Sequence, residues 1–425
     1  MTSSSSSSAD GSKATAMHPV APGVAARFGA RSRGRIALAL AVALASCAHA
    51  RPPAPLPRPW SAGARPRLAL FPLRNVSGDL IPARSVALSL EAELEAHGAP
   101  LVPGEELDRF LARHRVRYTD GVARETALAL RDELGVEGVL FPSVDLYATK
   151  GRLAIALGMR LVATADADIL WAGGVARTGD DAPGLFGLGI VDQPSDLERR
   201  EVSALGAALF AYLDGRERPR TDLCPSGGRF SPRADFRSAQ LDRLRRPTIA
   251  VLPFLNESQR REAGEAVALQ FVRQLVASGD FVVLEPGVVR DSMLEQRIVM
   301  DGGVSLEQAR LVQDQLGADL VLGGLVSRLD DQAGPGGPAA EFSAYVLERA
   351  SGLVIWSSTS RARGDDRVWF FDHGRVSTAS ALVCGLTSNI VAVMAGRAPN
   401  VASRERRPTR ATVASGASPG AGSAP

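Results

Sequence analysis

One stretch of sequence occurs twice in this chain and sets its architecture. Residues 249–258 and residues 68–77 each carry a continuous apolar run that leads into a proline, an asparagine and a serine. A short apolar run that ends in turn-forming residues is typical of a strand buried on both faces. The prolines of the two copies, Pro72 and Pro253, are 181 residues apart. We therefore expect each of these strands to begin one copy of a larger repeated unit.

Further landmarks follow each strand at nearly the same separation. A helical pattern comes next and ends in a glycine, which supplies a left-handed cap. A later helix in each copy ends in Leu-Gly, and the strands after it carry one tryptophan. The matched positions are Gly98 and Gly279, Gly135 and Gly317, Trp171 and Trp356, and Phe186 and Phe371, with separations between 181 and 185 residues. Because several independent landmarks agree, the sequence predicts an internal repeat.

The repeat predicts two homologous α/β domains in tandem, at residues 67–213 and 248–396. Within each, the element order is strand, helix, strand, two helices, three strands and a final helix. That order favours an α+β fold in which a mixed sheet of about five strands packs against helices. Residues 214–247 are polar and are interpreted as a linker, for which partial order stays open. Residues 397–425 have the composition of a disordered tail.

The amino terminus has the parts of a secretory signal. A basic region at residues 27–35 precedes an apolar run at residues 36–45, which is too short to span a bilayer as a mature helix. The run ends in Leu-Ala-Ser before Cys47, and this resembles the lipobox of bacterial lipoproteins. The resemblance implies that residues 1–46 are removed and that Cys47 is acylated. An ordinary signal cleaved after Ala50 is the alternative.

By the same resemblance, Ala48 after the cysteine implies sorting to the outer membrane, with the chain facing the periplasm. Two or three acyl chains would anchor it firmly. Residues 47–66 are rich in proline and alanine, so we expect an extended tether between the lipid and the first domain. Either Met1 or Met17 could be the true start.

The charge balance excludes one class of partner. Residues 1–46 hold five of the 49 basic side chains and one of the 46 acidic ones, so the remainder carries 44 basic and 45 acidic side chains. Without a basic excess, the mature chain cannot neutralise a phosphate backbone. We therefore expect no nucleic-acid partner.

The sequence carries no motif of a known catalytic or metal site. It has no Gly-x-Ser-x-Gly between a strand and a helix, since its one match, at residues 416–420, lies in the expected tail, and it has no His-Glu-x-x-His, Cys-x-x-Cys or phosphate-binding loop. The five histidines are scattered, and none has a second ligand at metal spacing. A repeated Gly-Asp-Asp, at residues 179–181 and 364–366, has too few carboxylates for a cation and is interpreted as a turn. We expect no enzyme activity, no cofactor and no bound metal.

Two loops are candidates for contact with a partner protein. Residues 184–189 are glycine-rich around Phe186 and lack the order of a dinucleotide-binding motif. Trp369, Phe370 and Phe371 form the densest aromatic cluster and precede the last predicted helix. Exposed aromatic loops favour protein contacts, whereas the same side chains in a core need no function, and the sequence leaves both interpretations open.

Two cysteines remain after Cys47. In an oxidising periplasm an even pair favours a disulfide, here between Cys224 and Cys384. The alternative is a buried thiol at Cys384, which has apolar neighbours, and a free Cys224.

The repeats resemble a known family of envelope domains. The second repeat carries an apolar strand ending in Pro-Phe, then Leu-Gly-Ala-Asp-Leu-Val-Leu-Gly-Gly at residues 316–324 and Ser-Gly-Leu-Val-Ile-Trp at residues 351–356. These motifs resemble the amino-terminal domain of TolB. The same fold occurs in the curli secretion lipoprotein CsgG and in LpoB-type activators of penicillin-binding proteins. The motifs indicate the fold but include no catalytic or binding residues, so a function inferred from them is an analogy.

Together these features predict a non-enzymatic outer-membrane lipoprotein that presents two such domains to the periplasm. Its expected partner is an envelope protein, such as a secretion assembly or a peptidoglycan synthase. The alternative is a structural subunit of a CsgG-like oligomeric export complex, and homo-oligomerisation stays open. A pore needs membrane-spanning hairpins of about ten alternating residues per strand, and the sequence offers no pair beyond those used by the sheets.

Overall fold

The computed structural model describes residues 59–181, 190–216, 230, 232–298, 304–331, 337–366, 368 and 375–397. The chain divides into two compact units after Arg51, and all of the described residues belong to the second unit. Several predicted features lie outside the described residues: the signal peptide, Cys47, Cys224, and the aromatic side chains Phe186, Trp369, Phe370 and Phe371.

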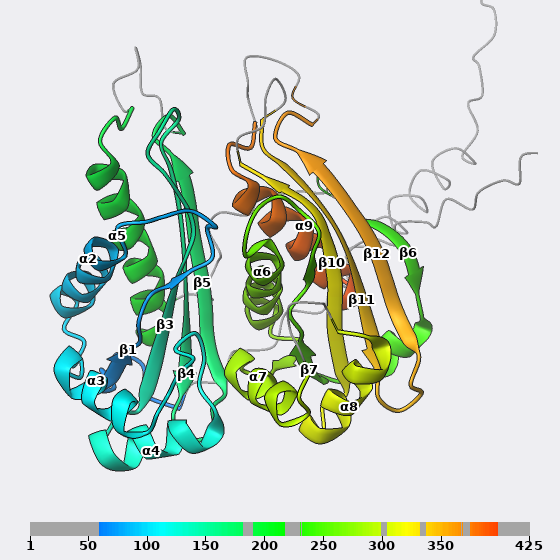
Figure 1. Ribbon diagram of the computed structural model, residues 1–425, viewed down its shortest axis with the longest axis horizontal. Coiled ribbons are helices and arrows are strands. Elements are labelled where there is room, and N and C mark those ends of the chain that lie inside the picture. The colour runs from blue at the N-terminus through cyan, green and yellow to red at the C-terminus, as the bar shows by residue number, and fades with distance from the viewer. Residues whose placement is uncertain are drawn as a thin grey trace, which may run out of the picture. The chain divides into compact units, whose positions relative to one another are not determined.

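The first repeat forms a mixed five-stranded sheet, here called sheet A (Figure 1). Its strands lie in the order β1-β3-β4-β5, with β2 beside β3, and only β1 and β2 run parallel to their neighbour. The strands are β1 (Leu68–Leu70), β2 (Arg74–Asn75), β3 (Gly138–Ala148), β4 (Ala154–Ala163) and β5 (Ile169–Thr178). The helices are α2 (Ala83–Ala96), α3 (Gly104–Arg113), α4 (Arg124–Leu134) and α5 (Pro194–Leu213).

The second repeat forms sheet B, with the order β6-β12-β11-β10-β7-β9 and β8 beside β10. Its strands are β6 (Arg233–Arg237), β7 (Thr248–Val251), β8 (Leu255–Asn256), β9 (Val282–Val283), β10 (Leu320–Asp330), β11 (Ala339–Glu348) and β12 (Val354–Arg363). Its helices are α6 (Ala263–Ser278), α7 (Pro286–Glu295), α8 (Leu306–Leu316) and α9 (Ala379–Met394), and the 3-10 helix Ala239–Arg243 precedes β7. Two mixed sheets with packed helices confirm the predicted α+β class.

Sheet B has seven strands among the described residues rather than about five. The counterpart of β9 in the first repeat is a single bridge between Leu68 and Leu101. β6 comes from residues 214–247, the expected linker, and pairs antiparallel with β12. At the matched offset the first repeat has residues 52–56, which include three prolines. Proline lacks the N–H group that a sheet ladder uses, so this sequence favours a strand less than that of β6 does.

The end of the expected tether contacts the first repeat. Trp60 packs, partly buried, against the core formed by sheet A and its helices. Arg65 Nη1 lies 2.9 Å from Asp214 Oδ1, and Gly63 N donates a 3.1 Å hydrogen bond to Leu213 O. Any free tether therefore ends before Trp60.

Local sequence signals account for how the elements end and pack. Gly135 and Gly317 end α4 and α8 with φ of 62° and 65°, the left-handed conformation that the Leu-Gly pattern predicts. Trp171 and Trp356 are fully buried at matched places in β5 and β12. The large side chains of each repeat thus fill corresponding positions beneath its own helices.

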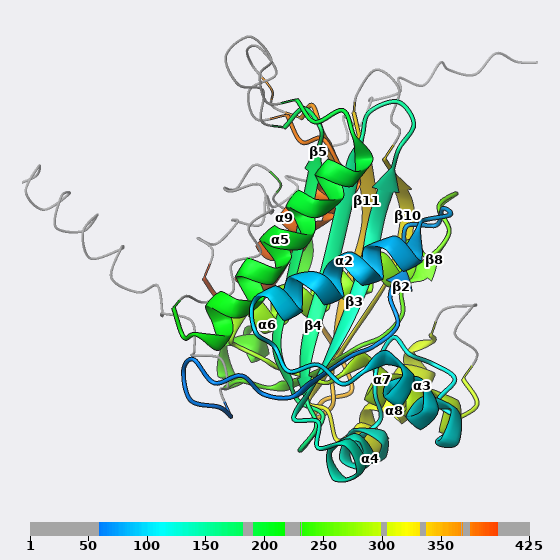
Figure 2. The same cartoon turned by 90° about the vertical axis from the view of Figure 1, so that its left-hand side faces the viewer.

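The second repeat also packs on the first. In Figure 2, α2 and α5 lie across one face of sheet A, and α6 of the second repeat contacts β5. α6 also contacts β10 and α9 in its own repeat, so it is enclosed between the two sheets (Figure 1). Fourteen of its sixteen residues are buried, whereas α2 buries only Val86, Leu90 and Leu94.

Small residues on sheet A make this packing close. Ala156, Gly158, Gly174 and Ala176 face α6 and α9. A Cβ atom at Gly158 would lie 1.9 Å from Nη2 of Arg273 on α6, so the arginine needs a glycine beneath it. The strand registers place Glu341, Ser343, Thr359 and Arg361 of sheet B at the matched positions. That face of sheet B carries longer, polar side chains.

We expect Gly158→Val to destabilise the protein and Ser343→Val, at the matched site, to do so far less. Valine at 158 would displace the Arg273 guanidinium, and overpacking a close contact costs about 3 kcal/mol. Valine favours strands at both positions, so the difference isolates the clash. Urea unfolding of both full-length variants measures it. Equal stabilities for the two variants would show that the contact of Arg273 with sheet A is unimportant.

Candidate functional site at the junction of the repeats

A cleft of about 600 Å³ opens where the two repeats meet, and we call it the inter-repeat cleft. The first repeat contributes β2 and the segment before α4, and the second contributes β7, β8, α6 and α7. Its lining residues are Arg74, Arg117, Tyr118, Thr119, Asp120, Val251, Pro253, Phe254, Asn256, Glu262, Gly264, Glu265, Ala268, Leu269, Val272, Pro286, Val289, Arg290 and Met293. The volume lies in the range of sites for small ligands or short peptide segments.

The repeated Pro-x-x-Asn-x-Ser pattern shapes the loops beside this cleft. Asn75 Oδ1 accepts hydrogen bonds from the Ser77 backbone N, at 3.0 Å, and from its Oγ, at 2.7 Å. Asn256 Oδ1 makes the same pair of bonds with Ser258, at 3.0 and 2.7 Å. The asparagine carboxamide thus replaces a backbone carbonyl and closes a local turn. In the first repeat this turn fixes the end of β2, where Arg74 projects into the cleft.

Arg74 joins the repeats through two glutamates at the start of α6. Its Nη2 lies 2.5 Å from Glu265 Oε2 and 3.2 Å from Glu262 Oε2. The hydrogen bond with Glu265 raises the pKa of Arg74 further. Burial raises the pKa of Glu265, and the hydrogen bond from Arg74 opposes that rise. Two carboxylates therefore share one arginine on this wall of the cleft.

The opposite wall is built from the segment before α4 and from α7. Arg290 donates through Nη1 to Asp120 and places its guanidinium 4.8 Å from the centre of the Tyr118 ring. Tyr118 is 47% exposed, so its ring forms the rim of the cleft. The Nε atom of Arg290 is buried and has no hydrogen-bond partner. The wall therefore holds an unused donor next to an aromatic rim.

Behind this wall a buried carboxylate fixes the segment before α4. Glu285 has a fully buried side chain, accepts a 3.2 Å hydrogen bond from Val122 N and lies 3.5 Å from Nη2 of Arg160. Burial raises the pKa of Glu285, and Arg160 partly offsets the rise. A Cβ atom at Gly121 would lie 2.6 Å from Gly287 N, so the two backbones touch. These contacts restrict the backbone of the segment before α4, which contains Tyr118.

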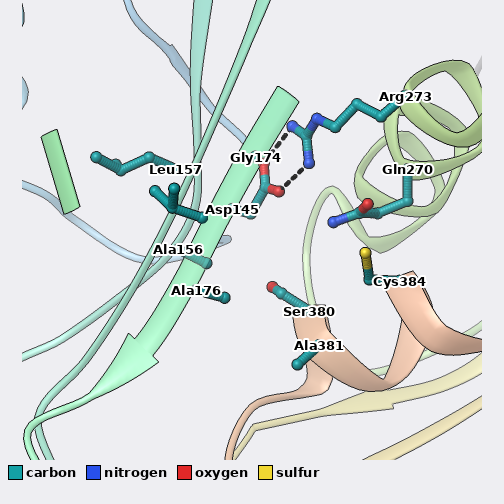
Figure 3. A pocket seen from close by; sticks show the side chains of 11 residues that line it. Asp145, Ala156, Leu157, Gly174, Ala176, Gln270, Arg273, Ser380, Ala381 and Cys384 are labelled. Carbon is teal, nitrogen blue, oxygen red and sulfur yellow. Dashed lines mark hydrogen bonds and ion pairs between the residues drawn. The ribbon is translucent and has the colours of Figure 1, made fainter. Parts of the chain in front are cut away.

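Deeper in the junction, a buried ion pair ties α6 to sheet A (Figure 3). Arg273 Nη1 lies 2.5 Å from Asp145 Oδ2, and its Nη2 lies 3.0 Å from Asp145 Oδ1 and 2.8 Å from Ser143 Oγ. The side chains of Arg273 and Asp145 are only 3% and 4% exposed. Asp145 is the extra residue of a β-bulge in β3, which turns its side chain out of the strand's alternation.

Arg260 adds a second clamp at the amino end of α6. It donates to the backbone carbonyls of Val76 and Ser77, both at 3.2 Å, and to that of Asp145. Its Nη1 also lies 2.6 Å from Asp331 Oδ2 in the second repeat. Arg260 thus links the loop after β2 and the bulge of β3 in the first repeat to Asp331 in the second repeat.

Of the residues predicted from sequence, Cys384 is the one that the structure places at this junction. It lies on α9 with 4% exposure, accepts a 3.3 Å contact from Gln274 Nε2 and is disulfide-bonded. Its pairing with Cys224 stays a prediction, because Cys224 is outside the described residues. The cleft residues Arg74, Tyr118, Asp120 and Arg290 were not predicted. Arg273 had one signal, since it is the one basic residue of a largely apolar helix and is two turns from Glu265.

A different buried acid lies on α5 in the first repeat. The Glu201 side chain has no exposed surface, neither oxygen has a hydrogen-bond partner, and Arg177 Nε lies 3.6 Å away. Burial raises its pKa to about 7, opposed by Arg177 and reinforced by Asp181. Its neighbour Glu198 instead accepts from Ser89 Oγ at 2.7 Å and Tyr147 Oη at 2.8 Å.

Two further features were sought within the described part of the chain. No group of three or more histidine, cysteine or acidic side chains there is placed to hold a metal ion. Among the same residues, no helix is both long and apolar enough to cross a membrane.

Comparison with known proteins gives distant structural likenesses. No family model and no curated protein matches this chain. The PelC dodecamer from Paraburkholderia phytofirmans matches at 20% identity over 38% of this chain and 95% of its own, with a TM-score of 0.27. Lipoprotein GNA1162 from Neisseria meningitidis matches at 20% identity over 29% of this chain and 88% of its own, with a TM-score of 0.24.

The carboxy-terminal domain of LpoB from Salmonella enterica matches at 22% identity over 27% of this chain and 83% of its own, with a TM-score of 0.24. LpoB-type activators are among the proteins in which the fold expected from the sequence motifs occurs. Identities and scores this low assign no partner to the present chain.

Removing one member of the buried ion pair should cost more than removing both. Arg273→Met leaves the Asp145 carboxylate buried without its cation, and we expect the free energy of unfolding to fall by about 3–5 kcal/mol. Adding Asp145→Leu removes the stranded charge, so the double variant should recover at least half of the loss. Urea unfolding of the single and double variants tests this. A double variant less stable than Arg273→Met would contradict it.

Glu201 should make stability fall as the pH rises. Its carboxyl has a pKa of about 7 in the fold and an ordinary pKa in the unfolded chain, so its stabilising contribution is complete below about pH 4.5 and is lost through pH 7. Compared with Glu201→Gln, which cannot titrate, the wild type should lose on the order of 3 kcal/mol over this range. Unfolding both proteins between pH 4 and 8 measures the difference, and a constant difference would refute the shifted pKa.

Proposed function

We propose that this chain is an outer-membrane-anchored periplasmic lipoprotein that binds an envelope protein and performs no catalysis. Its lipid would sit on Cys47, its two repeats would form a single binding body, and the inter-repeat cleft would receive part of the partner. A secretion assembly or a peptidoglycan synthase is the expected kind of partner.

The observation that carries this proposal is the cleft itself. It combines apolar side chains from α6 and α7 with arginines and carboxylates from both repeats. Tyr118 stands half-exposed at its rim, and tyrosines and arginines dominate the binding energy of protein interfaces. The lipobox supports the location, and the absence of recognised catalytic motifs in the sequence favours binding over chemistry.

In-cell crosslinking tests the proposal. A photoreactive amino acid at Tyr118 should capture one recurrent envelope protein, because the rim would contact it. Leu353, which is 59% exposed on a turn of the second repeat and does not line the cleft, is the matched control. Probes at Phe186 and Trp369 test the two predicted contact loops in the same experiment.

The lipid is tested on the same cells. Labelled palmitate should enter the wild type and not Cys47→Ala, because only the cysteine thiol and new amino terminus can be acylated. Capture only of further copies of this chain from Tyr118 would favour the oligomeric export subunit instead. Equal capture from Tyr118 and Leu353, or none from either, would overturn the role of the cleft.

A further inference from the structure

We infer that the inter-repeat cleft recognises the carboxyl-terminal end of a partner polypeptide, with the terminal carboxylate on Arg117 and Arg290 and an aliphatic side chain on the apolar floor. This inference rests on the proposed function, since it names the part of the partner that the cleft would take. The cleft contains a basic group, Arg117, that has no acidic partner among the described residues.

The acidic side chains of the cleft are already engaged. Glu262 and Glu265 share Arg74, and Asp120 accepts from Arg290. Among the described residues, the Arg117 guanidinium makes no hydrogen bond or ion pair, although it lines the same cleft. An added cation would find its carboxylates occupied, whereas an added anion would find an open guanidinium.

Arg290 supplies the second donor. Its side chain is 11% exposed, its Nη1 is used by Asp120, and its buried Nε has no acceptor. A buried donor without a partner is costly, and a carboxylate oxygen would satisfy it once a small shift of the Arg290 side chain brings Nε to the cleft. Asp120, Glu285 and Asp291 all act on Arg290, so the net attraction for a carboxylate comes from Arg117, which has no acidic partner among the described residues. Two guanidinium groups around one carboxylate give the charge-assisted bonds that arginine forms best.

The apolar floor of the cleft determines which side chain the carboxyl-terminal residue of the peptide would carry. Leu269 and Val272 come from α6, Val289 and Met293 from α7, and Phe254 from the loop after β7. All five side chains are buried, so the apolar surface for an aliphatic residue comes from their edges and from half-buried Pro253 and Pro286 in the same lining. Capture of a terminal carboxylate is a recurrent mode of peptide recognition.

A peptide fits the remaining groups better than a fatty acid. The cleft carries polar groups along its length, including the Thr119 hydroxyl and the Tyr118 phenol at the rim, and an alkyl chain would leave them against CH₂ groups. An extended peptide presents main-chain donors and acceptors to the same groups. The volume of about 600 Å³ admits a few residues.

Binding of matched synthetic peptides to the full-length protein tests the inference. The probe is an N-fluorescein pentapeptide of alanine, valine and leucine that ends in leucine, made as the free acid and as the carboxamide. We expect the acid to bind at least about tenfold more tightly by fluorescence polarisation, because charge-assisted bonds are lost in the amide. In Arg117→Gln the acid and the amide should bind within about twofold of each other. Arg109→Gln, which removes an exposed arginine of α3 outside the cleft, should keep the difference.

Each other outcome overturns the inference. Equal binding of acid and amide to the wild type, or no binding of either, would show that the cleft does not read a chain terminus. Displacement of the peptide by octanoate at the peptide's own affinity would show that a free fatty carboxylate is the ligand. If the peptides fail while the Tyr118 probe still captures an envelope protein in cells, the proposed function stands and only this inference falls.

Discussion

The buried pair of Arg273 and Asp145 is the interaction on which the arrangement of the two repeats depends. A charged pair with almost no solvent access is stable only when its geometry is complete, and here two guanidinium–carboxylate bonds and a serine hydroxyl complete it. The pair needs a bulge to present Asp145 and a glycine floor to admit Arg273. Those two features fix where α6 can lie, and the cleft exists because α6 lies there.

A comparison of the two repeats at matched positions explains why they pack in one order only. At the offset that aligns α2 with α6, the first repeat has Ala92 where the second has Arg273. At the offset that aligns β3 with β10, the second repeat has Ser327 where the first has Asp145, although both strands carry the bulge there. Each repeat therefore holds half of the pair and lacks the other half. A third unit stacked on sheet B would meet Ser343 in place of Gly158. Sheet B therefore lacks the glycine that lets a helix of the next unit pack as α6 does on sheet A.

The sequence predicted the elements within each repeat better than the contact between them. Turn glycines, apolar stripes and the two tryptophans report local structure and burial, and they placed the helices and central strands. β6 was missed because Arg233–Arg237 is polar and its pairing with β12 depends on residues far along the chain. The cleft was missed because its walls come from segments that meet only after the repeats pack. One signal was readable: β4 is almost continuously apolar, whereas β12 alternates, so only sheet A is covered on both faces.

Asymmetric packing of the two repeats also explains why a cleft forms beside α6 rather than beside α2. Leu269 of α6 lines the cleft and is 7% exposed, whereas Leu88, its counterpart at the repeat offset, is 55% exposed on α2. The two surfaces correspond at the repeat offset. In the second repeat, Arg74 and the segment carrying Tyr118 and Asp120 face it from the first repeat and turn an open helix side into an enclosed one. Among the described residues no such segments enclose the corresponding side of α2, where Leu88 is exposed, so two similar helices have different surroundings.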